Sequence, residues 1–171
     1  MKQTLWFASA VILLSHACLA APAILTGRCI ATTPNNSTSS AYLLGLGNNS
    51  NTTGGECWAG IGAYDDGSPL PSSGFLKNLI VVGRYTDGGS SPATWLVHVQ
   101  VRVNRAVTTL TCTATLSGGT ATQKSVRCAD HSHTVSVHAG DIVTVQMSTP
   151  GLSCTNTSCP GIALHAALEK Q

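Results

Sequence analysis

The sequence predicts an all-β domain, an antiparallel β-sandwich or barrel, and three observations support this prediction. Residues 75–147 consist of short apolar or alternating runs that turn residues separate. Charged residues make up only 9% of the chain, so its solubility depends on threonine, serine, asparagine and glycine. An even set of six cysteines remains after an N-terminal targeting segment. These features are typical of a disulfide-bonded β-protein from an oxidising compartment.

Residues 1–20 are predicted to be a secretory signal peptide. A lysine at the second position supplies the positive charge, residues 5–14 form the apolar core, and small residues precede a cleavage point after Ala20. The alternative is a lipoprotein signal with Cys18 acylated, but the residues before this cysteine fit that pattern poorly. The apolar run is too short for a membrane span. We therefore expect a secreted, periplasmic or cell-surface protein with residues 21–171 as a single domain.

The N-terminal part of that domain, residues 21–56, is polar and is predicted to be rich in loops. Its apolar island, residues 41–47, is expected to be the first strand of the sandwich. Residues 57–64 are rich in glycine and carry two aromatic side chains, which is consistent with a short strand. Residues 75–82 are predicted to be the first fully buried strand, and residues 86–92 a loop.

Strict alternation begins at Trp95. From this residue to Val103, every second side chain is apolar and faces one way, whereas the side chains between them face the other way. Asn104 and Arg105 are predicted to form a tight turn, because asparagine tolerates a positive φ. In the following strand, residues 109–116, threonines alternate with leucine, cysteine and alanine.

The C-terminal part repeats the strand pattern. Val135 and Val137 lead into a turn at residues 139–141, from which residues 143–147 return. Residues 162–168 have helical propensity, but in an all-β chain we expect them to form a closing strand.

The six cysteines are expected to form three disulfides. Cys154 and Cys159 can close only a small loop. Cys112 and Cys128 lie on segments that resemble the two arms of one hairpin, and a loop centred on residue 120 would place them within the roughly 7 Å that a disulfide requires. The pair that is left, Cys29 with Cys57, would join the ends of the polar N-terminal region. Buried free thiols are the alternative.

Five short segments of residues 75–148 form a recognisable set. They are Leu76-Lys77-Asn78-Leu79, Val101-Arg102-Val103-Asn104, the pair Cys112 and Cys128 around a Gly/Thr loop, His133-Thr134-Val135-Ser136-Val137, and Ala139-Gly140-Asp141-Ile142-Val143. On these segments the chain resembles bacterial secreted modules that share the jelly roll of the complement globular-head and tumour-necrosis-factor superfamily. The resemblance implies a jelly-roll β-sandwich, assembly as a trimer, and a binding or surface role rather than an enzymatic one.

Aromatic residues suggest a ligand site in the loops. Trp58, in its glycine-rich segment, and Tyr64 are candidates for a platform that binds a sugar, and Asp87 is a candidate loop carboxylate. Core packing is the better interpretation of Trp95, which shares a face with four valines. We expect functional residues in the loops around Trp58, Asp87 and Cys154.

Two histidines suggest a metal site. His131 and His133 are two residues apart, so on a strand they would share a face and bind one metal together with a histidine from a neighbouring strand, His98 or His165. The alternative is that they are exposed residues of a strand edge or a turn.

The sequence predicts no enzyme and no cofactor, because it contains no nucleophile elbow, phosphate loop or dinucleotide fingerprint. Its net charge is +2 with no obvious basic face, which argues against nucleic acid as a partner. We therefore expect a non-enzymatic extracellular module for surface interaction or assembly, with a homo-oligomer or another extracellular protein or glycan as its partner. A lectin-like carbohydrate-binding domain and a histidine-based metal-binding protein are the alternatives.

Overall fold

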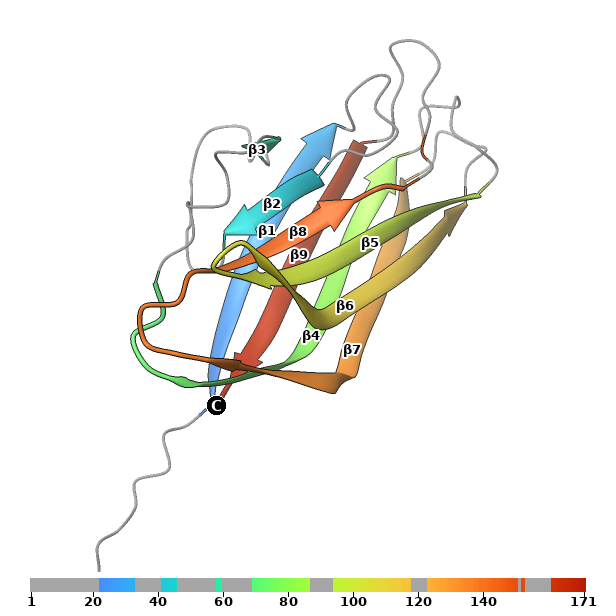
Figure 1. The fold of residues 1–171 in the computed structure, drawn as a ribbon. Coiled ribbons are helices and arrows are strands. Elements are labelled where there is room, and N and C mark those ends of the chain that lie inside the picture. The colour runs from blue at the N-terminus through green and yellow to red at the C-terminus, as the bar shows by residue number, and fades with distance from the viewer. Residues whose placement is uncertain are drawn as a thin grey trace, which may run out of the picture.

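The computed structural model describes residues 22–32, 41–45, 58–59, 69–86, 94–117, 123–150, 152 and 161–171, with the backbone alone for residues 29–32, 41–45 and 58–59. All the regular elements in this part of the chain are strands, and they form two antiparallel sheets that pack as a sandwich (Figure 1). The predicted fold class is confirmed.

The strands are distributed over a four-stranded and a five-stranded sheet. The four-stranded sheet has the order β1 (Ala23–Thr32), β9 (Gly161–Lys170), β4 (Gly74–Thr86), β7 (Gln123–Val137). The five-stranded sheet has the order β3 (Trp58–Ala59), β2 (Ala41–Gly45), β8 (Val143–Ser148), β5 (Thr94–Val103), β6 (Ala106–Ser117). With the short β3 set aside, the chain crosses from one sheet to the other at every connection except β5–β6, which is the strand order of a jelly roll.

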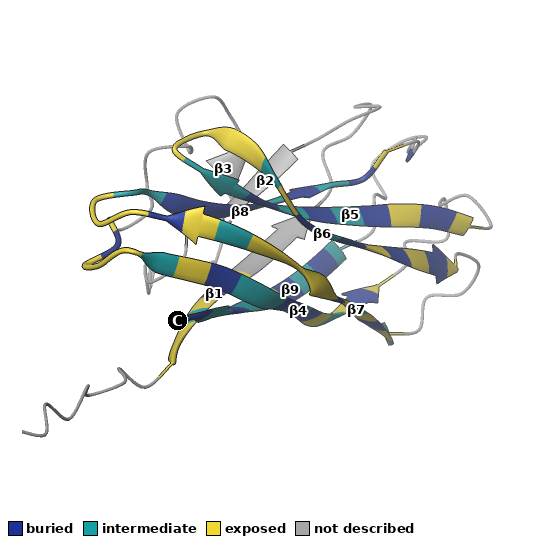
Figure 2. Cartoon of the chain, turned by 60° about the horizontal axis from the view of Figure 1, so that its bottom comes forward, coloured by how far each residue is buried: buried dark blue, intermediate teal, exposed yellow. Residues whose placement is uncertain are grey.

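The core lies between the two sheets, and alternation along the strands explains which residues enter it. Trp95, Val97, Val99 and Val101 are buried, as predicted, and their neighbours on β5 are partly or fully exposed. The same alternation runs along β6 and along the first part of β7 (Figure 2). Trp95 packs edge-on against Tyr85 with their ring centroids 5.7 Å apart, so both aromatics are core residues.

The N-terminal region differs from the prediction. The first strand is β1, at residues 23–32, and the apolar island contributes the second strand, β2. β1 was missed because its sequence alternates poorly, with Gly27 and Arg28 in the middle. The closing strand is confirmed as β9, which pairs with β1 on one side and with β4 on the other. Phe75, predicted to be buried, is 53% exposed, because it faces outward at the start of β4.

The disulfide between Cys112 and Cys128 is confirmed, with a Cα–Cα distance of 5.6 Å, but the predicted hairpin is wrong. β6 belongs to the five-stranded sheet and β7 to the four-stranded sheet, so the disulfide joins the edge strands of opposite sheets. A hairpin and a crossover between sheets have the same local pattern of alternation, so this pattern does not distinguish them. The pairing with the other strands does. The turn at residues 139–141 likewise leads from one sheet to the other.

The predicted turn between β5 and β6 is confirmed. Asn104 and Arg105 have φ values of 49° and 70°, the left-handed conformation that two-residue hairpin turns of type I′ require. Asn104 also fixes a second turn, since its Nδ2 donates to Asp141 Oδ1 at 2.7 Å and its Oδ1 accepts from the amide of Ile142 at 2.9 Å. The two turns at this end of the sandwich therefore support each other.

Candidate functional site

A β-bulge interrupts the four-stranded sheet at Asn78. Between the pairs Lys77–Thr134 and Leu79–Asp130, this one residue of β4 lies opposite three residues of β7, and the register with β9 shifts at the same place. Asn78 has a φ of 54°, which asparagine tolerates better than most residues do. Its Nδ2 donates to Glu169 Oε2 at 2.6 Å, and this bond is the main cause that lowers the pKa of Glu169. Bulges often redirect side chains near functional sites, so the polar residues around this one are candidates.

Asp130 is the buried member of this cluster, with its side chain only 4% exposed. Its carboxylate accepts hydrogen bonds from the backbone amides of Thr111, Ser132 and His133 and from the Ser132 hydroxyl. Burial alone would raise the pKa of Asp130, but these hydrogen bonds outweigh it and hold the pKa well below its usual range. Because Thr111 belongs to β6, Asp130 joins the two sheets beside the disulfide.

The two candidate metal ligands have different partners. His133 Nδ1 lies 2.8 Å from Asp130 Oδ2, whereas His131 Nδ1 lies 3.3 Å from Asn78 Oδ1. His98 lies on β5, in the other sheet, and both of its ring nitrogens lie within hydrogen-bond distance of threonine hydroxyls. Within the described residues, no group of three or more histidine, cysteine, aspartate or glutamate side chains is arranged to hold a metal ion. The histidine metal site stays a prediction.

The Asp130–His133 pair resembles part of a catalytic dyad, but the neighbouring serine does not complete it. The Ser132 hydroxyl donates to Asp130 Oδ1 at 2.9 Å, and its oxygen lies 3.2 Å from His133 Nδ1, an atom that already faces Asp130 Oδ2. The Nδ1 atom of His133 faces Asp130, so any role for this ring in solution falls to Nε2 of a side chain that is 51% exposed. The bonds of Asp130 are best explained by the bulge, whose backbone amides they satisfy.

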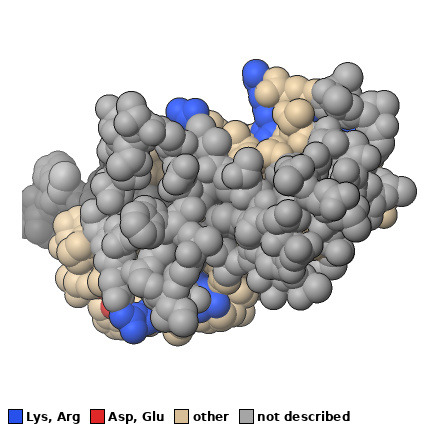
Figure 3. All heavy atoms as spheres, turned by 90° about the horizontal axis from the view of Figure 1, so that it is seen from above, with Lys and Arg blue, Asp and Glu red and all other residues tan. Residues whose placement is uncertain are grey.

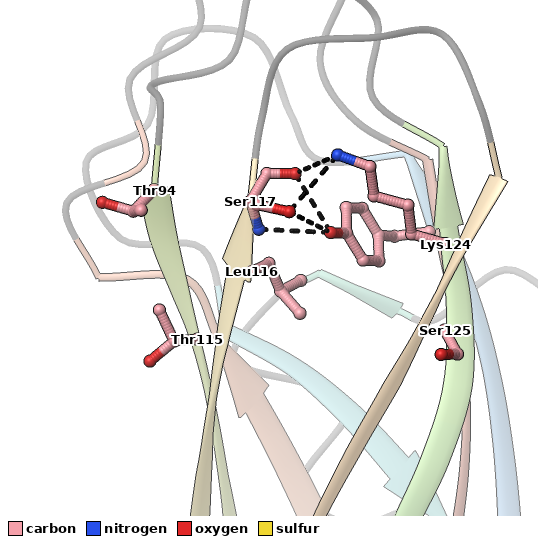
Figure 4. A pocket seen from close by; sticks show the side chains of 7 residues that line it. Thr94, Thr115, Leu116, Ser117, Lys124 and Ser125 are labelled. Carbon is pink, nitrogen blue, oxygen red and sulfur yellow. Dashed lines mark hydrogen bonds between the residues drawn. The ribbon is translucent and has the colours of Figure 1, made fainter.

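An open pocket of about 450 Å³ lies where β6 and β7 separate at one end of the sandwich (Figure 4). Figure 4 shows Leu116 pointing into the space between the sheets and the Lys124 amino group directed at Ser117. The Tyr85 hydroxyl donates to the Ser117 carbonyl at 3.0 Å and accepts from the Ser117 amide at 3.2 Å. Lys124 Nζ donates to the same carbonyl at 2.9 Å. These groups hold the two sheets together, and hydroxyls from threonine and serine form most of the remaining lining.

The outer face of the four-stranded sheet carries small and apolar side chains along its middle. We call this set the apolar strip; the strand register places on it Ile80, Val82, Ala129, Ala163 and Ala167. Val82 is 41% exposed, and the other members are partly or fully exposed. Ile24 and Phe75, which are 63% and 53% exposed, lie on the same face. They lie near the end of the sheet at which β1 and β4 begin. Such an apolar sheet surface is typical of a site that contacts another macromolecule.

Basic side chains cross the strip at the rung of Val82 and continue on both of its sides. We call this set the basic band; it consists of Arg28 on β1, Arg84 on β4, Arg127 on β7 and His165 on β9, all exposed. The sequence did not predict a basic face, because these residues are far apart in the chain and only the strand register brings them together. In the view from above, lysines and arginines are visible at separate places on opposite margins of the molecule (Figure 3).

The outer face of the five-stranded sheet is polar and its groups bind each other. Thr111 and Thr113 contact His98, and the Arg102 guanidinium donates to Gln146 Oε1 and, at 2.7 Å, to the Arg105 carbonyl. Gln100 Nε2 donates to the Thr108 carbonyl at 3.4 Å. Leu96 and Val107, which are 39% and 56% exposed, are apolar exceptions on this face.

No protein-family model matches the chain, and no curated protein matches it. The fold and the surfaces described above therefore carry the functional interpretation alone.

The predicted ligand site in the loops lies mostly outside the described residues. Tyr64 and Asp87 lie outside the described residues, and for Trp58 only the backbone in β3 is described. The predicted signal peptide also lies outside them, as do Cys57, Cys154 and Cys159, so two of the three disulfides stay predictions. No helix among the described residues is long and apolar enough to cross a membrane.

Proposed function

We propose that the protein is a secreted, non-enzymatic β-sandwich module for extracellular or surface interaction, and that it assembles with further copies of itself through the apolar strip. The strip is the observation that carries the proposal. It lies mainly on β9 and β4, the inner strands of the sheet, where alanine, isoleucine and valine face solvent together with His165 and Arg84. Burial of these apolar side chains against another surface would stabilise the assembly.

A second copy of the chain is the partner that the fold favours. The strand order is that of a jelly roll, and it agrees with the resemblance to the complement globular-head and tumour-necrosis-factor modules, which implies trimers. The disulfide supports an oxidising compartment, where such modules act. The other sheet is a poorer contact surface, because its outer polar groups already bind each other.

The test uses two residues with nearly equal exposure on opposite faces. Val82→Glu places a charge in the strip, where Arg127 lies directly across on β7 and can pair with it, so the fold should tolerate the change. Leu96→Glu is the matched control on the other sheet. Sedimentation of residues 21–171 should show oligomers for the wild type and for Leu96→Glu, and monomers for Val82→Glu. A strictly monomeric wild type would refute self-association, and so would equal effects of the two variants.

A further inference from the structure

The arginines of the basic band have no ionic partner in the described part of the chain. No ion pair there involves Arg28, Arg84 or Arg127, and the one hydrogen bond seen for their guanidinium groups joins Arg84 Nη1 to Gln123 Oε1 at 3.4 Å. The described carboxylates are engaged elsewhere, since Asp130 binds Thr111 and Asp141 binds Asn104. The third, Glu169, binds Asn78 and Lys77 at the other end of the sheet.

The register arranges these cations in a line across the strands. One rung of the sheet consists of Arg28, His165, Val82 and Arg127, which lie on β1, β9, β4 and β7 in that order. Arg84 lies two residues further along β4. Because neighbouring strands are about 4.8 Å apart, the Cα atoms of Arg28 and Arg127 are separated by about 14 Å. Three arginines spread across the whole width of the sheet carry more charge than one small anion would neutralise. An extended chain that carries several anionic groups can reach them.

We propose that the basic band binds an acidic polysaccharide, one that carries sulfate or carboxylate groups along its length. The planar guanidinium group binds both kinds of anion through paired hydrogen bonds. The surface is a sheet face and not a closed pocket, which fits a linear polymer. The disulfide supports an oxidising compartment, where polysaccharides are the abundant polyanions. The band itself holds no phenylalanine, tyrosine or tryptophan, the large aromatic side chains on which the bases of a single-stranded nucleic acid stack best.

Binding by a single copy does not depend on self-association. Arg28 and Arg127 lie on the two outer strands of the sheet and so flank the apolar strip. Copies that meet through the strip would cover the middle of the band, where Val82 and His165 share a rung, and would leave Arg28 and Arg127 at its two ends for the polymer.

The probe is immobilised dextran sulfate, with neutral dextran as the reference surface. Arg28→Gln/Arg127→Gln removes two charges from the band, and Arg102→Gln/Arg105→Gln removes two from the hairpin of the other sheet. We expect the first variant to bind dextran sulfate on the order of tenfold more weakly than the wild type, because each exposed ion pair contributes about threefold to the affinity. We expect the control variant to stay within about twofold. Thermal unfolding should confirm that both variants fold.

The outcomes separate this proposal from self-association. Equal losses of dextran sulfate binding in the two double variants would show a general effect of charge and would overturn the proposal. Tighter binding of the wild type to a single-stranded DNA oligonucleotide than to dextran sulfate would also overturn it. Sedimentation of the same proteins should show that Arg28→Gln/Arg127→Gln keeps the wild-type oligomeric state. Val82→Thr, which weakens self-association without adding a charge to the band, should still bind dextran sulfate. If the wild type is monomeric and the band variant still loses binding, self-association fails and the polysaccharide site stands.

Discussion

The two sheets of this sandwich share one core but differ in how they use their outer faces. On the five-stranded sheet, His98, Gln100 and Arg102 bind threonine, glutamine and backbone groups of the same face. On the four-stranded sheet, Val82 and the arginines of the basic band face solvent, and the polar contacts are concentrated around the bulge at Asn78. Both faces expose apolar side chains, but the first satisfies its polar groups internally, whereas the arginines of the second have no ionic partner in the described part of the chain. Two sheets with the same secondary structure can therefore have different capacities for binding.

The most severe test of the comparison removes the covalent link between the sheets. Cys112→Ala/Cys128→Ala opens a crosslink with a sequence separation of 16, and we expect the free energy of unfolding to fall by about 3 kcal/mol. Chemical denaturation measures the loss, and amide hydrogen exchange shows where it acts. β7, the edge strand next to the bulge, should exchange faster than β5, which pairs on both sides. Equal protection of the two strands would contradict a difference between the sheets.

The next test changes the bulge. We expect Asp130→Asn to cost about 2 kcal/mol of unfolding free energy at neutral pH, because several buried donors lose a charged acceptor. The pKa of Asp130 is lower in the folded protein than in the unfolded chain, so its contribution is complete above the ordinary aspartate pKa of 3.8 and is lost as the pH falls further. The difference between wild type and variant should therefore shrink below about pH 4. Chemical denaturation over a pH series measures it, and a constant difference would contradict this account.

A smaller effect is expected on the five-stranded sheet. Gln146→Leu leaves the partly buried Arg102 without one of its acceptors, and we expect it to cost about 1 kcal/mol. Oligomeric state should not change, since this face is not the proposed contact surface. A stability equal to that of the wild type would show that the polar contacts of this face contribute little, and the contrast between the faces would weaken.

The smallest change in stability is expected in the apolar strip. Val82→Thr keeps the shape of an exposed, β-branched side chain, so we expect the unfolding free energy to change by no more than about 0.5 kcal/mol. The same substitution makes the strip resemble the threonine-rich face opposite, and self-association measured by sedimentation should weaken. A large loss of stability with unchanged association would assign Val82 a role in the fold instead.

Local patterns in the sequence were sufficient for much of this fold. The alternation from Trp95 onward and the asparagine turn depend only on neighbouring residues, so they could be predicted without tertiary information. The closeness of Cys112 and Cys128 was predicted for the wrong reason, because the crossover from β6 to β7 brings them together between sheets.

The candidate surfaces depend on register, which no local pattern specifies. Arg28 and Arg127 are almost a hundred positions apart in the chain, and they share a line only because β9 and β4 lie between their strands. Asp130 illustrates the same limit. The sequence drew attention to the histidines beside it, but its own role depends on an amide of Thr111 in the other sheet.

The position of β9 has a consequence for biosynthesis. Residues 161–170 lie between β1 and β4, so the N-terminal strand has no partner in its own sheet until these residues have been made. While the chain is being translated or exported, β1 and one edge of β4 must remain unpaired, and unpaired edges of this kind promote aggregation. The complete four-stranded sheet can form only after β9 has left the ribosome or the export channel. The outer face on which both proposals depend forms at the same time. A chaperone that protects the unfinished chain would have to act until that moment.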